Sequence, residues 1–205
     1  MKKSINILLI MAAISYVLAV IIGGFLKENY SHVYNAISEL SEVGTKNIAV
    51  VNILFLFYNY ILIIYSVLYL FLYKKTMDLK TMIIYILIFI CGLSGIMMEI
   101  FPQEPRGIEL TIKGIMHFVF AGIAAIATIL ITVLSWIKYK KINETYSSYS
   151  LMSFIVIFVA GLVNIILMNI GVDNFFGLIE RITIGSFIVW LFVTGLYKYN
   201  DKHEI

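Results

Sequence analysis

The sequence predicts an all-α membrane protein, a six-transmembrane-helix bundle with a short extracytoplasmic interfacial helix. Of the 205 residues, 61% are hydrophobic and only 13% are charged, whereas soluble domains average about 45–50% apolar and about 25% charged residues. Disordered chains have low hydrophobicity and high charge, so that class is excluded too. The apolar runs are long and continuous, without the alternation of β-barrel strands.

Six stretches reach the length of about 20 mostly apolar residues that a helix needs to cross a hydrocarbon core of about 30 Å. In order, these predicted spans are Ile5–Leu26, Ile48–Tyr73, Thr81–Phe101, Ile112–Ile137, Ser150–Gly171 and Leu178–Tyr199. None contains an internal proline. The first span is longer than the apolar part of a usual signal peptide and no A-x-A site follows it, so we expect it to be retained. No second domain or internal repeat is visible, and residues 1–205 are predicted to form a single transmembrane domain.

Basic residues are distributed unevenly between the two sides of this predicted bundle. Ten of the 15 lie on the side that holds both termini, namely Lys2, Lys3, Lys74, Lys75, Lys80, Lys138, Lys140, Lys141, Lys198 and Lys202. The other side holds Lys27, Lys46, Arg106, Lys113 and Arg181. Because basic residues favour the cytoplasmic side, we expect a protein of the bacterial cytoplasmic membrane with both termini in the cytoplasm. The cytoplasmic lysines need no role beyond topology and contact with anionic lipid.

The composition also excludes several kinds of site. One cysteine cannot form an intramolecular disulfide, and three histidines argue against a three-histidine metal centre. A net charge of +3 gives no indication of nucleic acid as a partner. No cofactor or metal is predicted. Cys91, Gly92, Ser94 and Gly95 form a small-residue patch that is typical of close helix packing.

Four ionisable residues lie at similar depth near the outer ends of the spans: Glu99, His117, Glu180 and Arg181. Charges at such positions are costly unless they are paired or face water, which makes them candidates for function. A structural role is the alternative, with Glu180 favoured at a helix N-terminus and Arg181 paired with it. We expect all four to converge in one outer-leaflet pocket, covered by the segment that carries Glu39.

The segment between the first two spans is predicted to form an interfacial helix over Ser31–Val43. The apolar residues at helical spacing on one face are Val33, Ile37 and Leu40. Ser31 is a candidate N-cap and Gly44 a candidate stop. The opposite face, carrying His32, Asn35, Glu39 and Glu42, is predicted to lie in water above a membrane-lying helix.

The chain also resembles a family of bacterial integral membrane proteins known as domain of unknown function 998. The resemblance rests on an ordered set of landmarks: Tyr30-Ser31-His32, Ile37-Ser38-Glu39-Leu40, Asn47, Asn52, Phe101-Pro102 with Glu104, His117, Gly177-Leu178, Glu180-Arg181 and Trp190. It implies a six-helix fold and suggests that the outer motifs matter, but it implies no reaction.

The function that we favour from the sequence is a multi-pass membrane protein with an outer-leaflet-facing polar pocket for a lipid or small amphiphile. Its candidate ligand-binding residues are Ser38, Glu39, Glu99, Glu104, Arg106, His117, Glu180 and Arg181. Arginine suits phosphate groups, and pockets between helices commonly take lipid head groups. Membrane lipids and a small amphiphile are the expected partners, together with a membrane partner or a second copy of the chain.

Two alternatives stay open at this stage. An intramembrane lipid-modifying hydrolase would use His117 as base or metal ligand, with Glu39, Glu99 or Glu104 as its carboxylate partner and Ser31 or Ser38 as a nucleophile. No established hydrolase motif supports it. The other alternative is an accessory subunit whose lipid-facing aromatic residues contact the helices of a larger membrane complex.

Overall fold

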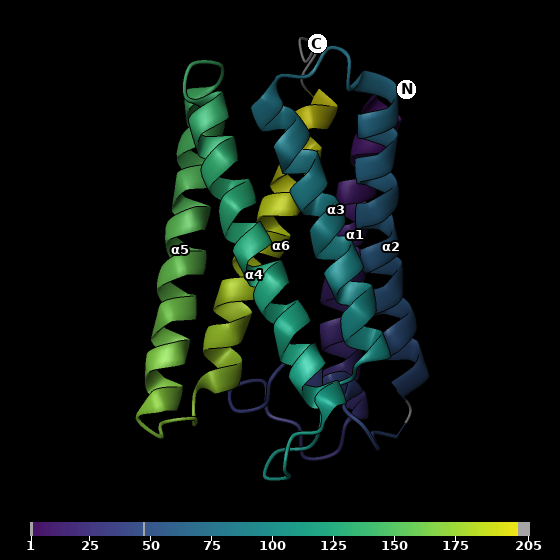
Figure 1. The fold of residues 1–205 in the computed structure, drawn as a ribbon, viewed down its shortest axis with the longest axis vertical. Helices are drawn as coiled ribbons and strands as arrows, with labels where there is room; N and C mark the ends of the chain where they lie inside the picture. Colours follow the sequence, from purple (N-terminus) through teal and green to yellow (C-terminus); the bar gives the residue numbers. More distant parts are fainter. Residues whose placement is uncertain (1, 47, 201–205) are drawn as a thin grey trace.

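The structure, a computed structural model, describes residues 2–46 and 48–200. It contains six long helices, α1 (Lys2–Leu26), α2 (Ile48–Tyr73), α3 (Leu79–Ile100), α4 (Ile112–Tyr139), α5 (Glu144–Asn169) and α6 (Phe176–Asn200), and one short 3₁₀ helix, η1 (Ser38–Ser41) (Figure 1). All six long helices are long and apolar enough to cross a membrane. The predicted six-helix fold class is therefore confirmed, and the protein is a multi-pass membrane protein. Met1, Asn47 and Lys202 lie outside the described residues.

The helix bounds differ from the prediction mainly where a polar side chain caps a helix before its apolar run begins. α2 has the predicted bounds, whereas α5 begins at Glu144 instead of Ser150. Asn143 caps α5 by accepting a hydrogen bond from the Tyr146 N–H group at 2.9 Å. Asp78 caps α3 in the same way, accepting from the Thr81 N–H group at 2.7 Å. Hydropathy alone does not detect these polar first turns, because a side-chain cap stabilises a helix end whatever its hydrophobicity.

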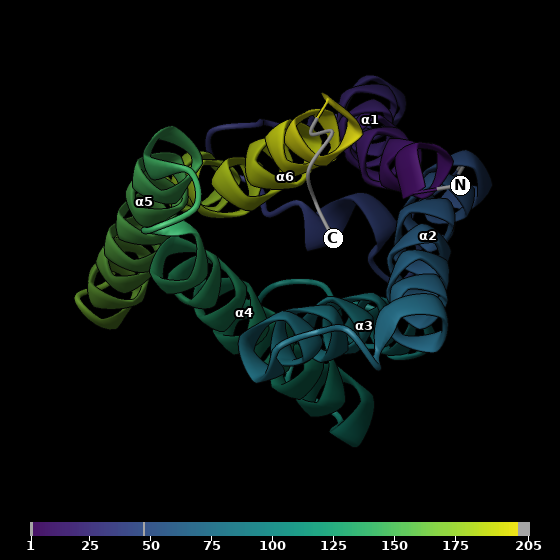
Figure 2. The same cartoon turned by 90° about the horizontal axis from the view of Figure 1, so that it is seen from above.

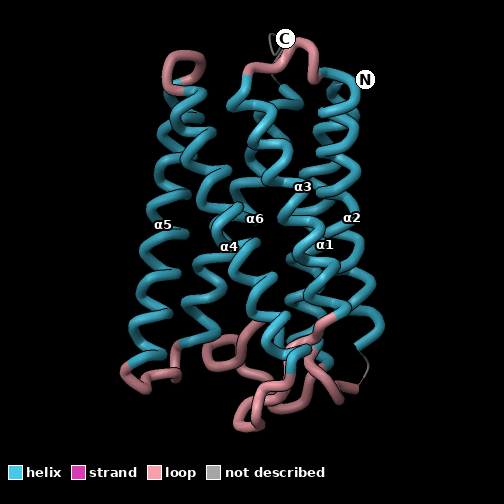
Figure 3. Tube along the Cα trace, viewed as in Figure 1, coloured by secondary structure: helices cyan, strands magenta, loops and turns pink. Residues whose placement is uncertain are grey.

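The helices form a closed ring. Each helix packs against its neighbours in the sequence, and α6 packs against α1 (Figure 2). The connections made by residues 27–46, 101–111 and 170–175 lie together at one end of the bundle, called here the loop end (Figure 3). The opposite end, where α1 begins and α6 ends, is called here the lysine-rich end, and it is the one predicted to face the cytoplasm.

Close packing of α3 on α2 confirms the prediction made from the small-residue patch. A Cβ atom added to Gly92 would lie 2.7 Å from the backbone oxygen of Asn59, and one added to Gly95 would lie 1.9 Å from the Asn59 Oδ1 atom. Both distances are far below van der Waals contact. The two glycines therefore set how closely the two helices approach.

The predicted interfacial helix over Ser31–Val43 is wrong. Turns replace it, with only the four residues of η1 in a helical conformation. The reason is that the carbonyl groups of Val33 and Tyr34 accept hydrogen bonds from α6, at 2.9 and 3.3 Å, instead of from the next turn of their own segment. Gly44 has a φ of 88°, but no α-helix precedes it.

The buried and exposed residues of this segment also do not follow the two faces that a helix would have. Ile37 and Leu40 are buried in a small core with Val51 and Phe55 of α2, as their spacing predicts. Val33, in contrast, is 43% exposed. Glu39 was expected in water, yet it is only 3% exposed. A buried carboxylate requires partners, and these partners make up the site described next.

Candidate functional site

Three segments that lie far apart in the sequence meet at the loop end. Residues 30–42 lie on the start of α6, where the Gly177 N–H group donates to the Tyr34 carbonyl at 3.3 Å. The Ile37 N–H group donates to the Glu180 carboxylate at 2.6 Å. The connection between α3 and α4 joins them through its Gln103 carbonyl, which accepts from the Val43 N–H group at 3.0 Å. These contacts bring the charged residues of all three segments together.

Arg181 fastens residues 30–36 to α6. Its Nη1 atom donates to the carbonyl oxygens of Asn35 and Gly177, both at 2.8 Å. Its Nη2 atom donates to the hydroxyl group of Tyr30, which in turn donates to the Ala36 carbonyl at 2.7 Å. The Nε atom is buried and has no hydrogen-bond partner in the described part of the chain.

Gly177 permits this arrangement by having no side chain. A Cβ atom at this position would lie 2.2 Å from the Asn35 carbonyl oxygen and 2.8 Å from Arg181 Nη1. Backbone atoms cannot yield as a flexible side chain can. Any larger residue would therefore displace the segment from α6.

Glu39 and Arg106 form the central ion pair. Arg106 Nε donates to Glu39 Oε1 at 2.7 Å, and its Nη2 atom lies 2.7 Å from the same oxygen. Glu39 also accepts from the Asn35 side-chain amide at 2.5 Å and from the Ala36 N–H group at 3.1 Å. Four donors thus compensate the burial of this carboxylate, which explains why it can leave water.

The Arg106 side chain reaches the molecular surface, in contrast to its partner. It is 32% exposed, against 4% for the Glu39 side chain. Its guanidinium carbon lies 4.5 Å from the centre of the Tyr34 ring and 5.5 Å from that of Phe176. Arg106 Nη1 is 3.6 Å from the carboxylate of Asp173, whose side chain is 52% exposed. The guanidinium group of Arg106, the carboxylate of Asp173 and two aromatic rings therefore lie close together at a solvent-accessible part of the surface.

The surroundings shift the pKa values of two groups in these loops. Partial burial acts to lower the pKa of Arg106, but the Glu39 carboxylate more than offsets it and raises that pKa above its ordinary value. Burial raises the pKa of Tyr30 to about 12, although the nearby Arg181 acts in the opposite direction. Arg106 is thus a cation and Tyr30 a neutral hydroxyl at physiological pH.

Glu104, another predicted site residue, supports the start of α4. Its carboxylate accepts from the Thr111 hydroxyl at 2.6 Å and from the Thr111 N–H group at 3.0 Å. These two hydrogen bonds lower the pKa of Glu104. Thr111 itself caps α4 by accepting from the Lys113 N–H group at 3.1 Å. Glu104 therefore has a local structural partner, and among residues 2–46 and 48–200 no hydrogen bond or ion pair joins it to Glu39 or Arg106.

His117 has a backbone partner at the outer end of α3. His117 is buried, and its Nδ1 atom lies 2.9 Å from the Phe101 carbonyl oxygen at the end of α3. Within residues 2–46 and 48–200, no hydrogen bond or ion pair connects His117 with Glu99, Glu180 or Arg181. The convergence of all four residues in one pocket therefore stays a prediction, while Glu180 and Arg181 are both hydrogen-bonded to the segment that carries Glu39, through the backbone of Ile37 and Asn35.

The serines proposed as nucleophiles have other partners. Ser38 donates to the Gln103 side-chain oxygen at 3.2 Å. The Ser31 hydroxyl accepts from the N–H groups of Val33 and Tyr34 at 3.3 and 3.4 Å. Neither is hydrogen-bonded to His117 in the part of the chain that the structure describes. No group of three or more metal-ligating side chains occurs there either.

The sequence reasoning missed Asp173 and the two rings around Arg106. Asp173 lies three residues before the start of α6, at the same end of the bundle as Glu180, and this position in the sequence was a usable signal. Tyr34 and Phe176 could not be singled out from the sequence, because the chain has 14 tyrosines and 14 phenylalanines. Only the fold distinguishes these two from the aromatic residues that face lipid.

Comparison with known proteins identifies the same family as the sequence landmarks did. No curated protein and no solved structure matches this chain. A model of one family, described as a protein of unknown function (DUF998), matches residues 10–197. That stretch covers all of α2 to α5 and most of α1 and α6, including every charged residue of the loop end discussed above. The chain belongs to the DUF998 family of proteins of unknown function.

Proposed function

We propose that the loop end binds the head group of a zwitterionic lipid or a small zwitterionic amphiphile in the outer leaflet. The observation that carries the proposal is the accessible Arg106, which lies near the rings of Tyr34 and Phe176 and beside the exposed carboxylate of Asp173. A guanidinium group binds phosphate oxygens in a bidentate manner. A carboxylate beside aromatic rings suits an ammonium group.

The balance of charge favours a zwitterion over a simple anion. Glu39 already neutralises most of the charge of Arg106, and Asp173 adds a second negative group at 3.6 Å. A purely anionic ligand would be repelled by both carboxylates, whereas a phosphate linked to an amine can contact Arg106 and Asp173 at once. The phosphate would take the outer side of the guanidinium group, and the amine would lie toward Asp173.

The surroundings suit the apolar part of such a molecule. Ile108 and Leu110, in the connection that carries Arg106, are 53% and 47% exposed, and Phe175 beside α6 is 52% exposed. Exposed apolar residues next to a polar group are expected where acyl chains and head groups are contacted together. Glu180 and Arg181, both half-buried, then act below the site by holding residues 30–37 in position.

The proposal is tested by measuring which lipids stay bound. The protein is reconstituted in nanodiscs containing equal amounts of phosphatidylethanolamine and phosphatidylglycerol, released, and analysed by native mass spectrometry. We expect retained phosphatidylethanolamine, with occupancy reduced about tenfold by Arg106→Gln, since a hydrogen bond to a charged group contributes about 1.5–3 kcal/mol. The matched control is Lys113→Gln, which removes an exposed cation from the start of α4.

Two results would overturn the proposal. One is equal lipid retention by the wild type, Arg106→Gln and Lys113→Gln. The other is a preference for phosphatidylglycerol that depends on Arg106, because it would show that the ligand is a simple anion. Unfolding midpoints of all three proteins are measured in parallel, so that lost binding is distinguished from lost structure.

A further inference from the structure

Tyr34 links the two charged groups of the head-group site. Its hydroxyl donates to Asp173 Oδ2 at 3.3 Å. Its ring centre lies 4.5 Å from the guanidinium carbon of Arg106, and its carbonyl oxygen accepts from Arg106 Nη2 at 3.1 Å. Tyr34 therefore contacts the anion through its hydroxyl and the cation through its ring and its backbone.

The hydrogen bonds of Arg106 leave one of its nitrogen atoms for a ligand. Nε and Nη2 are directed to Glu39, and Nη2 also donates to the Tyr34 carbonyl. Nη1, in contrast, makes no hydrogen bond within residues 2–46 and 48–200, and it lies 3.6 Å from Asp173 Oδ2. Since each terminal nitrogen of a guanidinium group carries two N–H donors, a phosphate oxygen can be bound at Nη1, directly beside the Asp173 carboxylate.

The Asp173 carboxylate has acceptor capacity that the protein does not use. Oδ2 accepts from the Tyr34 hydroxyl, whereas Oδ1 accepts no hydrogen bond in the part of the chain that the structure describes. The Asp173 side chain is 52% exposed, so a ligand can reach it. The Tyr34 hydroxyl can also accept while it donates, because a phenol oxygen has both capacities. A carboxylate and a phenol oxygen therefore lie together as acceptors beside Arg106 Nη1.

We propose that Tyr34 and Asp173 make this site selective for a primary ammonium group, so that it takes a phosphoethanolamine head group and discriminates against the trimethylated phosphocholine. The inference rests on the proposed function and narrows its ligand class. A primary ammonium group has three N–H donors, which the Asp173 carboxylate and the Tyr34 hydroxyl can share. A trimethylammonium group has no N–H donor and gains nothing from either hydrogen-bond acceptor.

The aromatic rings of the site do not favour the trimethylated group either. Quaternary ammonium groups are recognised by the faces of aromatic rings. Here the Arg106 guanidinium group already lies over the rings of Tyr34 and Phe176, at 4.5 and 5.5 Å from their centres, and a second cation over the same rings would be repelled by it. The methyl groups would also keep the ligand nitrogen away from the Asp173 carboxylate, and the attraction between charges falls with distance.

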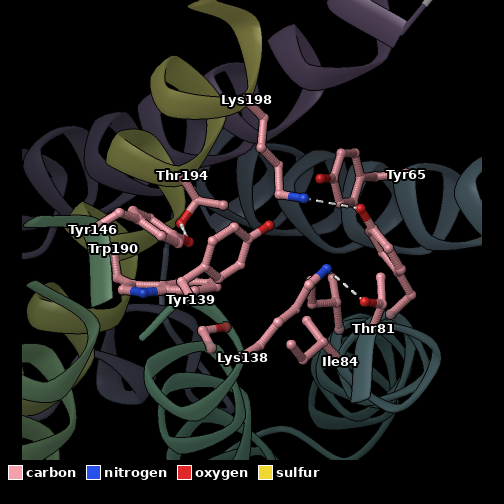
Figure 4. Close-up of a pocket in the computed structure, with 12 residues that line it drawn as sticks. Tyr65, Thr81, Ile84, Lys138, Tyr139, Tyr146, Trp190, Thr194 and Lys198 are labelled. Atoms are coloured by element: carbon pink, nitrogen blue, oxygen red, sulfur yellow. Dashed lines mark hydrogen bonds between the residues drawn. The ribbon is translucent and has the colours of Figure 1, made fainter. Parts of the chain in front are cut away.

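Contacts between ammonium and hydroxyl groups of this kind occur at the other end of the same bundle. Figure 4 shows the side chains around a small cavity at the lysine-rich end (Figure 4). Lys198 Nζ, from α6, donates to the Tyr85 hydroxyl at 3.1 Å, although Lys198 is only 8% exposed. Lys138 Nζ, from α4, donates to the Thr81 hydroxyl at 2.5 Å. The contact proposed between a ligand ammonium group and the Tyr34 hydroxyl has the same chemistry as the Lys198–Tyr85 contact.

Selectivity is measured by competition between lipids that differ only in the methylation of the nitrogen. The protein is reconstituted in nanodiscs with equal amounts of dioleoyl phosphatidylethanolamine and dioleoyl phosphatidylcholine, and the lipids that stay bound are identified by native mass spectrometry. We expect the wild type to retain phosphatidylethanolamine over phosphatidylcholine by about tenfold, the size of effect that a hydrogen bond to a charged group gives. The monomethylated and dimethylated lipids should fall between them, in the order of their remaining N–H groups.

Two substitutions locate the selectivity. Asp173→Asn removes the charge of the acceptor and should reduce the preference to about twofold or less. Tyr34→Phe keeps the ring over Arg106 but removes the hydroxyl, and should lower the preference about threefold. The matched controls are Glu28→Gln, an exposed acid of the loop end, and Tyr60→Phe, an exposed tyrosine of α2, neither of which should change the ratio of the two lipids.

Head groups without acyl chains show which source of this chemistry the site takes. Free phosphoethanolamine and free phosphocholine are added separately as competitors. Displacement of the bound lipid by phosphoethanolamine identifies the head group as sufficient, and no displacement by either identifies an intact lipid as the ligand. Equal displacement by both would overturn the selectivity.

Two further results would overturn it. One is equal retention of phosphatidylethanolamine and phosphatidylcholine by the wild type, and the other is a preference that folded Asp173→Asn or folded Tyr34→Phe leaves unchanged. If Arg106→Gln still lowers the retention of both lipids, the head-group site stands and only its selectivity is refuted. Retention of both lipids that does not depend on Arg106 refutes the head-group site and the selectivity together. Unfolding midpoints of all variants distinguish lost binding from lost structure.

Discussion

At the loop end, Arg106 and Arg181 are held by a carboxylate and by backbone carbonyl groups, whereas at the lysine-rich end Lys138 and Lys198 contact hydroxyl groups around a cavity. Arg181 donates in several fixed directions, and its planar group fastens two segments of chain to each other. The lysines are compact charges on flexible stems, so their geometry fixes the packing less strictly than a planar guanidinium group does. The charge network at the loop end therefore has mainly a structural role. The exception is Arg106, whose side chain reaches the molecular surface.

The first prediction concerns which end faces the outside, and its effect is all or none. In protein with Cys91→Ala, a membrane-impermeant maleimide applied to intact cells is expected to label Glu109→Cys in the loop end. Lys140→Cys at the lysine-rich end should react only after the cells are lysed. Both positions are exposed, so the difference reports orientation. The reverse pattern would place the loop end in the cytoplasm and move the proposed head-group site to the opposite leaflet.

The second prediction measures the structural role of one cation at each end. Arg181→Ala is expected to lower the free energy of unfolding by about 2–4 kcal/mol, because it leaves several buried polar groups at the loop end without partners. Lys138→Gln at the other end should change it by less than about 1 kcal/mol. Equilibrium unfolding in mixed micelles gives both values.

Arg181→Lys is the conservative control for that comparison. It keeps the charge but cannot donate to Asn35, Gly177 and Tyr30 at once, so an intermediate loss is expected. Equal stability of Arg181→Ala and the wild type would show that residues 30–37 are held without Arg181.

The third prediction tests the close approach of the loop segment to α6. Gly177→Ala places a Cβ atom 2.2 Å from the Asn35 carbonyl oxygen, and we expect a loss of about 1–3 kcal/mol, as is usual for overpacking. Gly185→Ala in the same helix meets no atom within 4 Å and should be within about 0.5 kcal/mol of the wild type. Similar thermal unfolding midpoints for the two variants would contradict the packing described here.

The fourth and smallest effect concerns pH at the start of α4. The pKa of Glu104 is lowered by its hydrogen bonds to Thr111, so the folded state binds a proton there less readily than the unfolded state. Its contribution to stability is present above the ordinary pKa of 4.5 and is lost as the pH falls through the lower value of the folded state.

Glu104→Gln should therefore be less stable than the wild type at neutral pH, with the difference shrinking in acid. Glu109→Gln, which removes an exposed acid from the same connection, is the control and should follow the wild-type profile. Unfolding midpoints measured between pH 3 and pH 7 test this. A difference between Glu104→Gln and the wild type that does not vary with pH would show that Glu104 acts by its shape and not by its charge.

The sequence by itself determined the number of spans, their approximate bounds and the burial of Ile37 and Leu40. It also indicated that the glycines of α3 allow α2 to approach closely. Each of these follows from properties that belong to one segment at a time, such as length, hydropathy or side-chain size. Such properties act in the same way whichever neighbours the segment meets.

Only the tertiary structure decided the form of residues 31–43 and the burial of Glu39. The Asn35 carbonyl is bonded to Arg181, 146 residues away, and Glu39 is paired with Arg106, 67 residues away. The inward turn of Lys198 likewise depends on Tyr85 of α3. A backbone carbonyl takes whichever donor offers the better hydrogen bond, and a charge is buried only where partners converge on it. Those partners come from distant helices and connections, and closure of the six-helix ring brings them together.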